Sequence, residues 1–197
     1  MKATAVRHGA PSRERMIEAT GELLQKQGYA GTGLAEILAV SGAPRGSLYF
    51  HFPGGKEELA CAALRASGES WKRRIEALTD AVDDPLEALD AVCKMLGDEL
   101  EASGWEIGCP IATVALEAAA GSEAIRETCA DHFAGWEALV VDRLVARGMA
   151  HALATTVATL TVAAIEGALM LARVHRSRAP LDRVARALRA QLAARTA

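Results

Sequence analysis

Two short helical patterns separated by a tight break constrain the fold of this chain more than any other feature. Apolar residues recur at helical spacing from about Gly33 to Val40. Ser41-Gly42-Ala43 interrupts this pattern, and Pro44 stands where the first turn of a new helix would begin. The new helix, from Pro44 to about Phe50, is too short to be stable alone, so neighbouring helices must hold it. We expect a sharp corner between two short helices.

The remainder of the chain is also helical in pattern and is long enough to bury a substantial core. Its 197 residues suit one large domain or two small ones, and 51% of them are apolar. Alanine, the best helix former, supplies much of that share. Ser12 and Asp84 are the expected N-caps, and Gly28 is the expected end of the first helix. The other helices are expected at about 12–28, 56–81, 85–102, 111–120, 123–147, 152–176 and 180–195. The sequence therefore predicts an all-α fold of about nine helices.

Charge is divided unevenly along the chain. Residues 1–56 carry seven Lys or Arg and four Asp or Glu, whereas the remainder carries fifteen and twenty-one. The first seven residues or so are expected to form a loose tail with Lys2 and Arg7. A basic N-terminal segment on an acidic body predicts two parts with different tasks. We place an N-terminal domain at 8–56 and a second domain at 57–197, connected by the helix from about 56 to 81.

Cysteine usage and the pattern of apolar residues both favour a cytoplasmic protein without a membrane segment. The four cysteines form no CxxC pair, and no signal peptide is expected. Reduced thiols in the core explain them, with a redox switch as the alternative. The run from Ala152 to Ala172 is nearly long enough to span a bilayer, but it contains Glu166 and four threonines. We expect it to be a buried helix.

Patterns of catalysis and of metal binding are missing from the sequence. It has no recognisable pairing of a nucleophile with a base and no glycine-rich phosphate loop. His132 lies one turn from Cys129, but a metal ion needs more ligands than these, so a hydrogen-bonded histidine is the expected role. We expect no enzyme activity, no cofactor and no metal.

The helix that begins after Pro44 carries side chains suited to DNA. In a helix-turn-helix the second helix enters the major groove, and residues at its N-terminus contact base edges. Arg45 stands at that N-terminus, and Gly46 would let the backbone approach DNA closely. Leu48 and Phe52 form the apolar side that holds the helix to its neighbours. The expected base-edge contacts are Pro44, Arg45 and Ser47, and the expected phosphate contacts are Tyr49, His51 and Lys56 with the N–H groups of its helix start.

The segment from residue 12 to 60 closely resembles the DNA-binding domain of TetR-type transcriptional repressors. The resemblance rests on Thr32, on the turn before Pro44, on Arg-Gly-Ser-Leu-Tyr-Phe-His-Phe ending at Phe52, and on the pair Lys56-Glu57. By this resemblance Thr32 joins the expected phosphate contacts. Three departures are a glycine after Thr32, Pro44 in place of a usual Ser or Thr, and a Pro-Gly-Gly link one residue longer than the commonest.

A second resemblance concerns the C-terminal half. The run Gly108 to Glu117, together with the Pro-Gly-Gly link, looks like the subgroup of this family that represses drug-efflux or flavonoid-responsive operons. Members of the family bind a small molecule inside the helical C-terminal domain and dimerise through their last two long helices. The resemblance therefore implies a homodimer through about 152–176 and 180–195, which would place two reading helices about one DNA turn apart.

Bulky or soft side chains near the expected ligand pocket are the candidate effector contacts, although ordinary core packing explains any one of them as well. Glu166 is the more informative residue, because burying an unpaired carboxylate is costly. It faces the pocket, pairs at the dimer interface or reaches solvent. The candidate set is Trp105, Cys109, Phe133, Trp136, Glu166 and Met170.

Two functions remain in view at the level of the sequence. The first is a ligand-responsive repressor whose homodimer binds palindromic operator DNA and is released by a small hydrophobic or aromatic effector. The second is a helical protein–protein adaptor, which would not need a basic N-terminal third or Tyr49 and His51 beside Lys56. Salt-dependent affinity for duplex DNA would separate the two.

Overall fold

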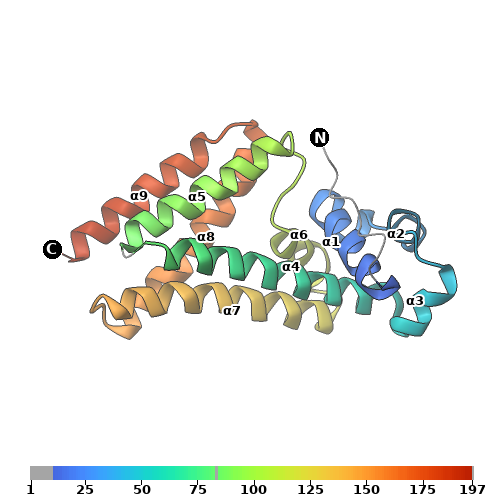
Figure 1. Cartoon of the computed structure of the whole chain (residues 1–197). Helices are drawn as coiled ribbons and strands as arrows, with labels where there is room; N and C mark the ends of the chain where they lie inside the picture. Colours follow the sequence, from blue (N-terminus) through green and yellow to red (C-terminus); the bar gives the residue numbers. More distant parts are fainter. Residues whose placement is uncertain (1–10, 83, 197) are drawn as a thin grey trace. The chain divides into compact units, whose positions relative to one another are not determined.

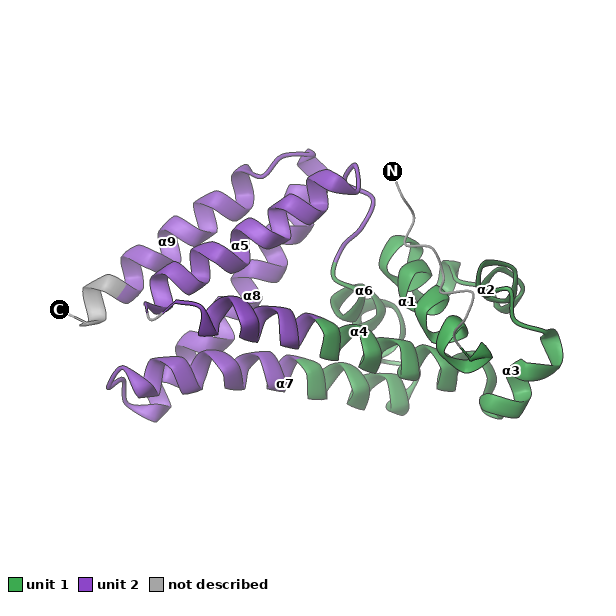
Figure 2. Ribbon diagram, viewed as in Figure 1, with its two compact units in different colours: residues 1–70, 109–132 green, residues 71–108, 133–197 purple. Residues whose placement is uncertain are grey.

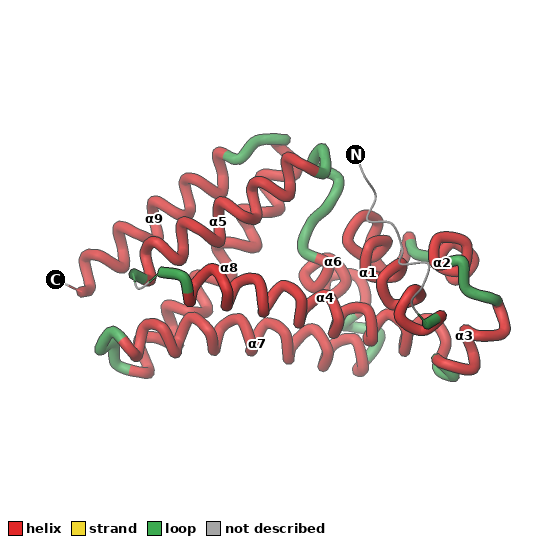
Figure 3. The backbone as a smooth tube through the Cα atoms, in the orientation of Figure 1, coloured by secondary structure: helices red, strands yellow, loops and turns green. Residues whose placement is uncertain are grey.

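In the computed structural model, which describes residues 11–82 and 84–196, the chain is folded into helices joined by short loops (Figures 1 and 3). Within this part of the chain there are nine helices and no strand, which confirms the predicted class. Their bounds are α1 Ser12–Gly31, α2 Leu34–Ser41, α3 Arg45–His51, α4 Gly55–Asp80, α5 Pro85–Ala102, α6 Pro110–Ala118, α7 Glu123–Ala146, α8 His151–His175 and α9 Ala179–Thr196. The expected tail with Lys2 and Arg7, and the start of the first domain at residue 8, lie outside the described residues.

The ends of these helices follow the glycines, prolines and capping residues of the sequence. Gly28 has φ 73° and breaks the helical path of α1, although one further turn continues to Gly31. The carboxylate of Asp84 accepts a hydrogen bond from the N–H of Leu86 at 3.0 Å, so Asp84 caps α5 as predicted. The prediction for Ser12 is wrong, because Pro11 occupies the N-cap of α1 and no side chain caps that end.

The helices form two compact units, which are shown in different colours in Figure 2. Unit 1 comprises Met1–Ser70 and Cys109–His132, and unit 2 comprises Trp71–Gly108 and Phe133–Ala197. Helices α4 and α7 each contribute residues to both units. Unit 1 thus combines the first three helices with α6 and with the first turns of α4 and α7. The domain boundary at residues 56 and 57 stays a prediction.

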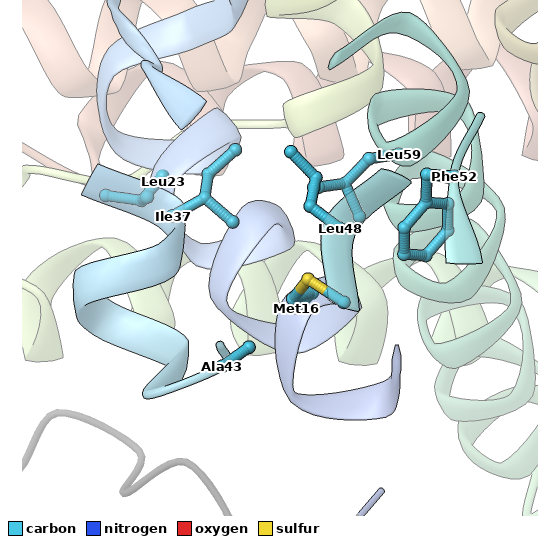
Figure 4. Packing of buried hydrophobic residues seen from close by; sticks show 7 residues of the cluster. All are labelled: Met16, Leu23, Ile37, Ala43, Leu48, Phe52 and Leu59. Carbon is cyan, nitrogen blue, oxygen red and sulfur yellow. The ribbon is translucent and has the colours of Figure 1, made fainter. Parts of the chain in front are cut away.

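The core of unit 1 holds the short helices in place. Its buried cluster draws Met16 and Leu23 from α1, Ile37 from α2, Leu48 from α3 and Leu59 from α4 (Figure 4). The cluster is completed by Ala43 and Phe52, on either side of α3. Burying a side chain of this size stabilises the fold by about 1.5–3 kcal/mol. Helix α3 therefore has the neighbours that its length requires.

Unit 2 is built on the packing of α5, α8 and α9. Leu89 and Cys93 of α5 lie against Ala185 and Leu188 of α9. A second cluster joins Leu144 of α7 to α8 and α9 through Ala154, Val157 and Leu192. Small alanines on α8 allow the close approach of these helices.

Helix α8 is buried on one face only. Ala154, Ala158 and Ala172 are 0% exposed, and this face covers the core. The opposite face exposes large apolar side chains, namely Leu153, Leu160, Met170, Leu171 and Val174. Within the described residues, α8 is the one helix that is long and apolar enough to cross a membrane by length and composition. The expectation of a buried helix is thus right for one face only.

The four cysteines are thiols outside any disulfide, and three of them are buried. Burial is the main cause that raises the pKa of Cys93 to about 12 and that of Cys129 to about 11. Both groups therefore stay protonated near neutral pH, which favours the reading as core thiols over a redox switch.

Candidate nucleic-acid interface

Helix α3 is fixed to unit 1 by the two side chains expected to hold it. Leu48 and Phe52 are each 1% exposed, and the N–H of Phe52 donates to the carbonyl of Leu48 at 2.7 Å. Because these residues lie one helical turn apart, they mark a single inward side of α3. The other side chains of the helix are left at the surface or half-buried.

The corner before α3 requires a glycine. Gly42 has φ 59°, in the left-handed region that residues with a Cβ rarely adopt. The guanidinium of Arg15 donates to the carbonyl of Gly42 at 3.4 Å, and the N–H of Ala43 donates to the hydroxyl of Ser41 at 3.3 Å. These contacts set the angle at which α3 leaves α2.

The N-terminus of α3 presents its expected base-edge residues to the outside. Pro44, Arg45 and Gly46 are exposed, and Ser47 is half-buried. A Cβ atom added at Gly46 would find no neighbour within 4 Å. The protein's own packing therefore does not require a glycine at this position, whereas the close approach of an outside surface would.

Tyr49 and the start of α4 lie close to each other. Tyr49 is 59% exposed, and its Cε1 is 3.9 Å from the position that a Cβ of Gly55 would take. Lys56 follows directly, with its Nζ 4.3 Å from the centre of the Tyr29 ring. His51, at the end of α3, is half-buried. The structure thus places an exposed phenol near the start of α4, where the lysine is.

Two backbone N–H groups directly before Lys56 donate within the chain. The N–H of Gly54 donates to the carboxylate of Glu58 at 2.8 Å, and the N–H of Gly55 donates to the carbonyl of Phe52 at 2.9 Å. The N–H groups of these two glycines are thus occupied, and the expectation of free N–H groups from Lys56 onward stays a prediction.

Thr32 is the member of the predicted DNA-binding set that does not reach the surface. It is 0% exposed, and its hydroxyl donates to the carbonyl of Gly28 at 2.7 Å. Its N–H donates to the carbonyl of Tyr29 at 3.3 Å. In this arrangement Thr32 holds the turn between α1 and α2, and a phosphate has no access to its hydroxyl.

Phe50 is an exposed residue that the sequence reasoning missed. Its side chain is 80% exposed, and its ring lies edge-on to that of His51 with 4.9 Å between centroids. The sequence indicates this exposure, because Phe50 lies two residues from both Leu48 and Phe52. On a helix that position faces away from the two buried residues.

Of the six candidate ligand residues, Phe133 and Trp136 are in contact. Their rings meet edge to face with 5.5 Å between centroids. The indole Nε1 of Trp136 is buried and has no hydrogen-bond partner, and the same holds for the hydroxyl of Thr161, which is 5% exposed. Both atoms belong to unit 2. They are polar groups that a bound molecule would satisfy.

The other candidates lie in different surroundings. Trp105 has φ 68° in the loop after α5 and is half-buried. Cys109 belongs to unit 1, where its sulfur caps α6 by accepting from the N–H of Ala112 at 3.4 Å. Met170 is 59% exposed and lies on the outward face of α8, whereas Glu166 on the same helix is half-buried.

A metal site has no support in the described residues, since they contain no group of three or more His, Cys, Asp or Glu side chains able to hold an ion. His132 packs against Gly68, and its Nε2 is buried without a partner. Burial lowers the pKa of His132 below its ordinary value. The predicted hydrogen bond of His132 is thus not formed at this nitrogen.

Comparison with protein families and known proteins gives matches over both halves of the chain. Residues 16–63 match the family described as bacterial regulatory proteins, tetR family. Residues 85–187 match the family described as transcriptional regulator LmrA/YxaF-like, C-terminal domain. The first match contains the corner and α3, and the second contains α5 to α8 and part of α9.

Individual relatives extend over nearly the whole chain. The HTH-type transcriptional regulator LmrA of Bacillus subtilis (strain 168) is 36% identical over 170 residues, which is 86% of this chain and 90% of LmrA. The HTH-type transcriptional regulator Rv0196 of Mycobacterium tuberculosis is 38% identical over 184 residues, which is 90% of this chain and 92% of the relative.

Among solved structures, a regulatory protein TetR from Rhodobacter sphaeroides superposes with a TM-score of 0.82 at 22% identity. The superposition covers 91% of this chain and 98% of that one, and it supports the fold.

Proposed function

Because the chain belongs to the TetR family, whose members are non-enzymatic DNA-binding regulators of transcription, we propose that it is a ligand-responsive repressor. Its homodimer binds a palindromic operator and is released by a small hydrophobic or aromatic effector. Family membership decides between the regulator and the adaptor in favour of the regulator. The location that this function requires is the cytoplasm, where the DNA is.

The exposed side of α3 is the observation that carries the proposal. Arg45, with Pro44 and Ser47, contacts base edges, and the open space at Gly46 lets the backbone enter the groove. Phe50 adds an apolar surface that suits a thymine methyl group. Thr32 is left out of the contacts, because its hydroxyl is buried.

Three side chains around this helix suit the phosphates. Tyr49 and His51 donate hydrogen bonds, and Lys56 supplies a charge at the start of α4. Phosphate contacts of this kind carry no sequence information, so they add affinity for all duplexes. They also make binding depend on salt, because each neutralised phosphate releases counterions.

The outward face of α8 supports the dimer. Its five large apolar side chains share one exposed face, and an exposed face of several apolar side chains is typical of a protein–protein contact. A shallow groove continues this face between the two C-terminal helices, with Leu153 and Leu160 of α8 on one side and Leu188 and Leu192 of α9 on the other. A second copy of the chain fits as the occupant, because a palindromic operator needs two reading helices related by a two-fold axis.

Unit 2 also supplies polar groups for an effector. Trp136 lies ten residues before the end of α7, and Thr161 lies ten residues after the start of α8. Both positions belong to unit 2, in which α7 and α8 follow each other through one turn and meet near it through Leu144, Ala154 and Val157. An aromatic molecule with a carbonyl or another acceptor would stack near Phe133 and accept from the indole N–H. Glu166 faces this site or the dimer interface.

Release of DNA follows from differential affinity. Helix α4 contributes residues to both units, so it is the element through which a ligand in unit 2 would reach α3. An effector that binds better to one spacing of the two reading helices shifts the dimer toward that spacing. If that spacing does not match successive major grooves, the effector lowers operator affinity. By linkage, operator DNA lowers the affinity for the effector by the same factor.

Titration of the chain with duplex DNA from its own upstream region tests the proposal. Binding at low ionic strength should be strong, should weaken steeply with salt and should show a dimer on each duplex. A monomer in solution, or no binding at low salt, would overturn the proposal. Release by an aromatic effector, followed in the same titration, tests the ligand response.

A further inference from the structure

The turn after Gly28 is held by a carboxylate from a distant helix. Glu117 of α6 accepts a hydrogen bond from the N–H of Ala30 at 2.9 Å, across a separation of 87 residues. Its oxygens also fill the space beside Gly28, where a Cβ atom would overlap them. Helices α1 and α6 both belong to unit 1 and lie side by side in Figure 2.

The same turn is connected to the proposed DNA-binding surface. The ring of Tyr29 lies under the Nζ of Lys56, at 4.3 Å from its centre. Because Tyr29 follows Gly28 directly and precedes Ala30, its place depends on the two residues that Glu117 contacts. Thr32 closes the turn by donating to the carbonyl of Gly28 at 2.7 Å. An unbroken set of contacts therefore leads from α6 to Lys56.

We propose that Glu117 is a positioning residue for DNA binding: its carboxylate fixes the turn from Gly28 to Thr32, and that turn sets Tyr29 under the ammonium of Lys56. This inference rests on the proposed phosphate contact of Lys56. It adds that α6 controls this contact. A movement of α6 would withdraw the carboxylate from Ala30 and loosen the lysine.

Two features distinguish this role from simple support of the fold. Glu117 is exposed, and a hydrogen bond between an exposed carboxylate and an exposed N–H contributes little to stability. The N–H of Ala30, on the other hand, lies in the turn that follows the break at Gly28, so a side chain from elsewhere satisfies it. The contact therefore fixes geometry more than it stabilises the unit.

The test compares four variants in titrations of the upstream duplex at several salt concentrations: Glu117→Ala, Glu117→Gln, Lys56→Ala and the double variant Glu117→Ala/Lys56→Ala. Glu117→Ala should lower affinity about threefold to tenfold for each protomer and reduce the salt slope by about 1 for each protomer, as Lys56→Ala does. The double variant should bind like Lys56→Ala alone, because both changes disable the same phosphate contact. Glu117→Gln should bind like the wild type, since its amide oxygen still accepts from Ala30.

Glu127→Ala is the matched control for the lost charge. Glu127 is an exposed carboxylate of unit 1, at 3.9 Å from Arg126. Its removal should leave the salt slope unchanged.

The outcomes separate this inference from the proposed function. An unchanged slope for Glu117→Ala, with a reduced slope for Lys56→Ala, overturns the inference alone. Unchanged slopes for both variants overturn it together with the assigned role of Lys56. Additive losses in the double variant also contradict it, since independent contacts would add.

Hydrogen exchange gives a readout that does not depend on DNA. The amide of Ala30 should exchange faster in Glu117→Ala and at the wild-type rate in Glu117→Gln, while the unfolding midpoint stays within a few degrees. An unchanged exchange rate in Glu117→Ala would show that the carboxylate does not hold the turn.

Discussion

Helices α3 and α8 both leave apolar side chains exposed, but the surroundings of those side chains differ. On α3, Phe50 is 80% exposed and directly follows the exposed Tyr49, which lies one turn after the exposed Arg45. On α8, Val174 is 72% exposed and shares its face with leucines and a methionine. Exposure of an apolar group does not by itself identify the partner.

The side chains around the exposed apolar group indicate which partner it binds. A DNA groove presents methyl groups, base-edge donors and acceptors and phosphates together, so a mixed surface such as α3 suits it. A second protein copy presents another apolar face, so the uniform surface of α8 suits a homodimer. The following predictions test this difference, from the largest expected effect to the smallest.

A charge on the outward face of α8 should have the largest effect. Leu160→Glu would bury a carboxylate in the proposed dimer interface. If the carboxylate finds no partner, its burial destabilises the dimer by at least about 3 kcal/mol. We expect a monomer by light scattering and an operator affinity at least about 100-fold lower. Thr155→Glu is the control, because Thr155 is exposed on another side of the same helix. A Leu160→Glu dimer would contradict the assignment of this face.

Alanine substitutions of an inward and an outward apolar residue of α3 should separate the effect on stability from the effect on DNA binding. Leu48→Ala removes a side chain that is 1% exposed and should destabilise the protein by about 2–5 kcal/mol in thermal unfolding. Phe50→Ala should leave stability within about 0.5 kcal/mol, because its ring is in solvent, yet it should weaken operator binding. Equal losses of stability would mean that the two sides of α3 are not distinct.

Arg45→Ala should relax the preference for bases. A good contact to a base edge is worth about 1–3 kcal/mol of discrimination, so operator affinity should fall more than affinity for an unrelated duplex. Competition between the two duplexes at one salt concentration measures this ratio. A uniform loss on both duplexes would place Arg45 among the phosphate contacts.

Tyr49→Phe should act on all sequences alike. The lost phosphate hydrogen bond is worth about 1 kcal/mol for each protomer, so affinity should fall about fivefold for each protomer on operator and unrelated duplex. The same pair of duplexes provides the measurement. A selective loss on the operator would mean that the phenol contacts a base.

The smallest expected effect is on the pH dependence of stability, and it comes from His132, which belongs to neither exposed face. Burial lowers the pKa of His132, so the unfolded chain takes up a proton before the folded one as the pH falls. Stability is therefore retained above the ordinary histidine pKa of about 6.5 and declines below it, until the folded group is protonated too. Unfolding of wild type and His132→Gln from pH 8 to 5 should show a shallower decline in the variant.

Features of the fold that depend on a few neighbouring residues could be predicted from the sequence. The bounds of α5 followed from Asp84 and Pro85, and the break in α1 followed from Gly28, because caps and breaks act within a few residues. Leu48 and Phe52 were identified from helical spacing in the same way. Phe50 could have been found by this rule, since it lies between them.

The residues that sequence reasoning misplaced depend on contacts far along the chain or on which side of a helix faces the core. Thr32 looks like a surface residue until Gly28 accepts its hydroxyl in a turn that buries both. Met170 belongs to an almost wholly apolar helix, so no period in the sequence separates its inward from its outward face. Glu117 could not be singled out for its role, because its partner at Ala30 is 87 residues away.

By itself, the sequence determined the helices, the corner at Gly42 and the chemistry displayed by α3, because each of these follows from neighbouring residues. The tertiary structure decided which face of α8 is buried, that α6 joins the first three helices in one unit, and that Glu117 meets the end of α1. The physical reason is that burial and long-range hydrogen bonds depend on which distant surfaces meet, and the pattern of one segment does not contain that information.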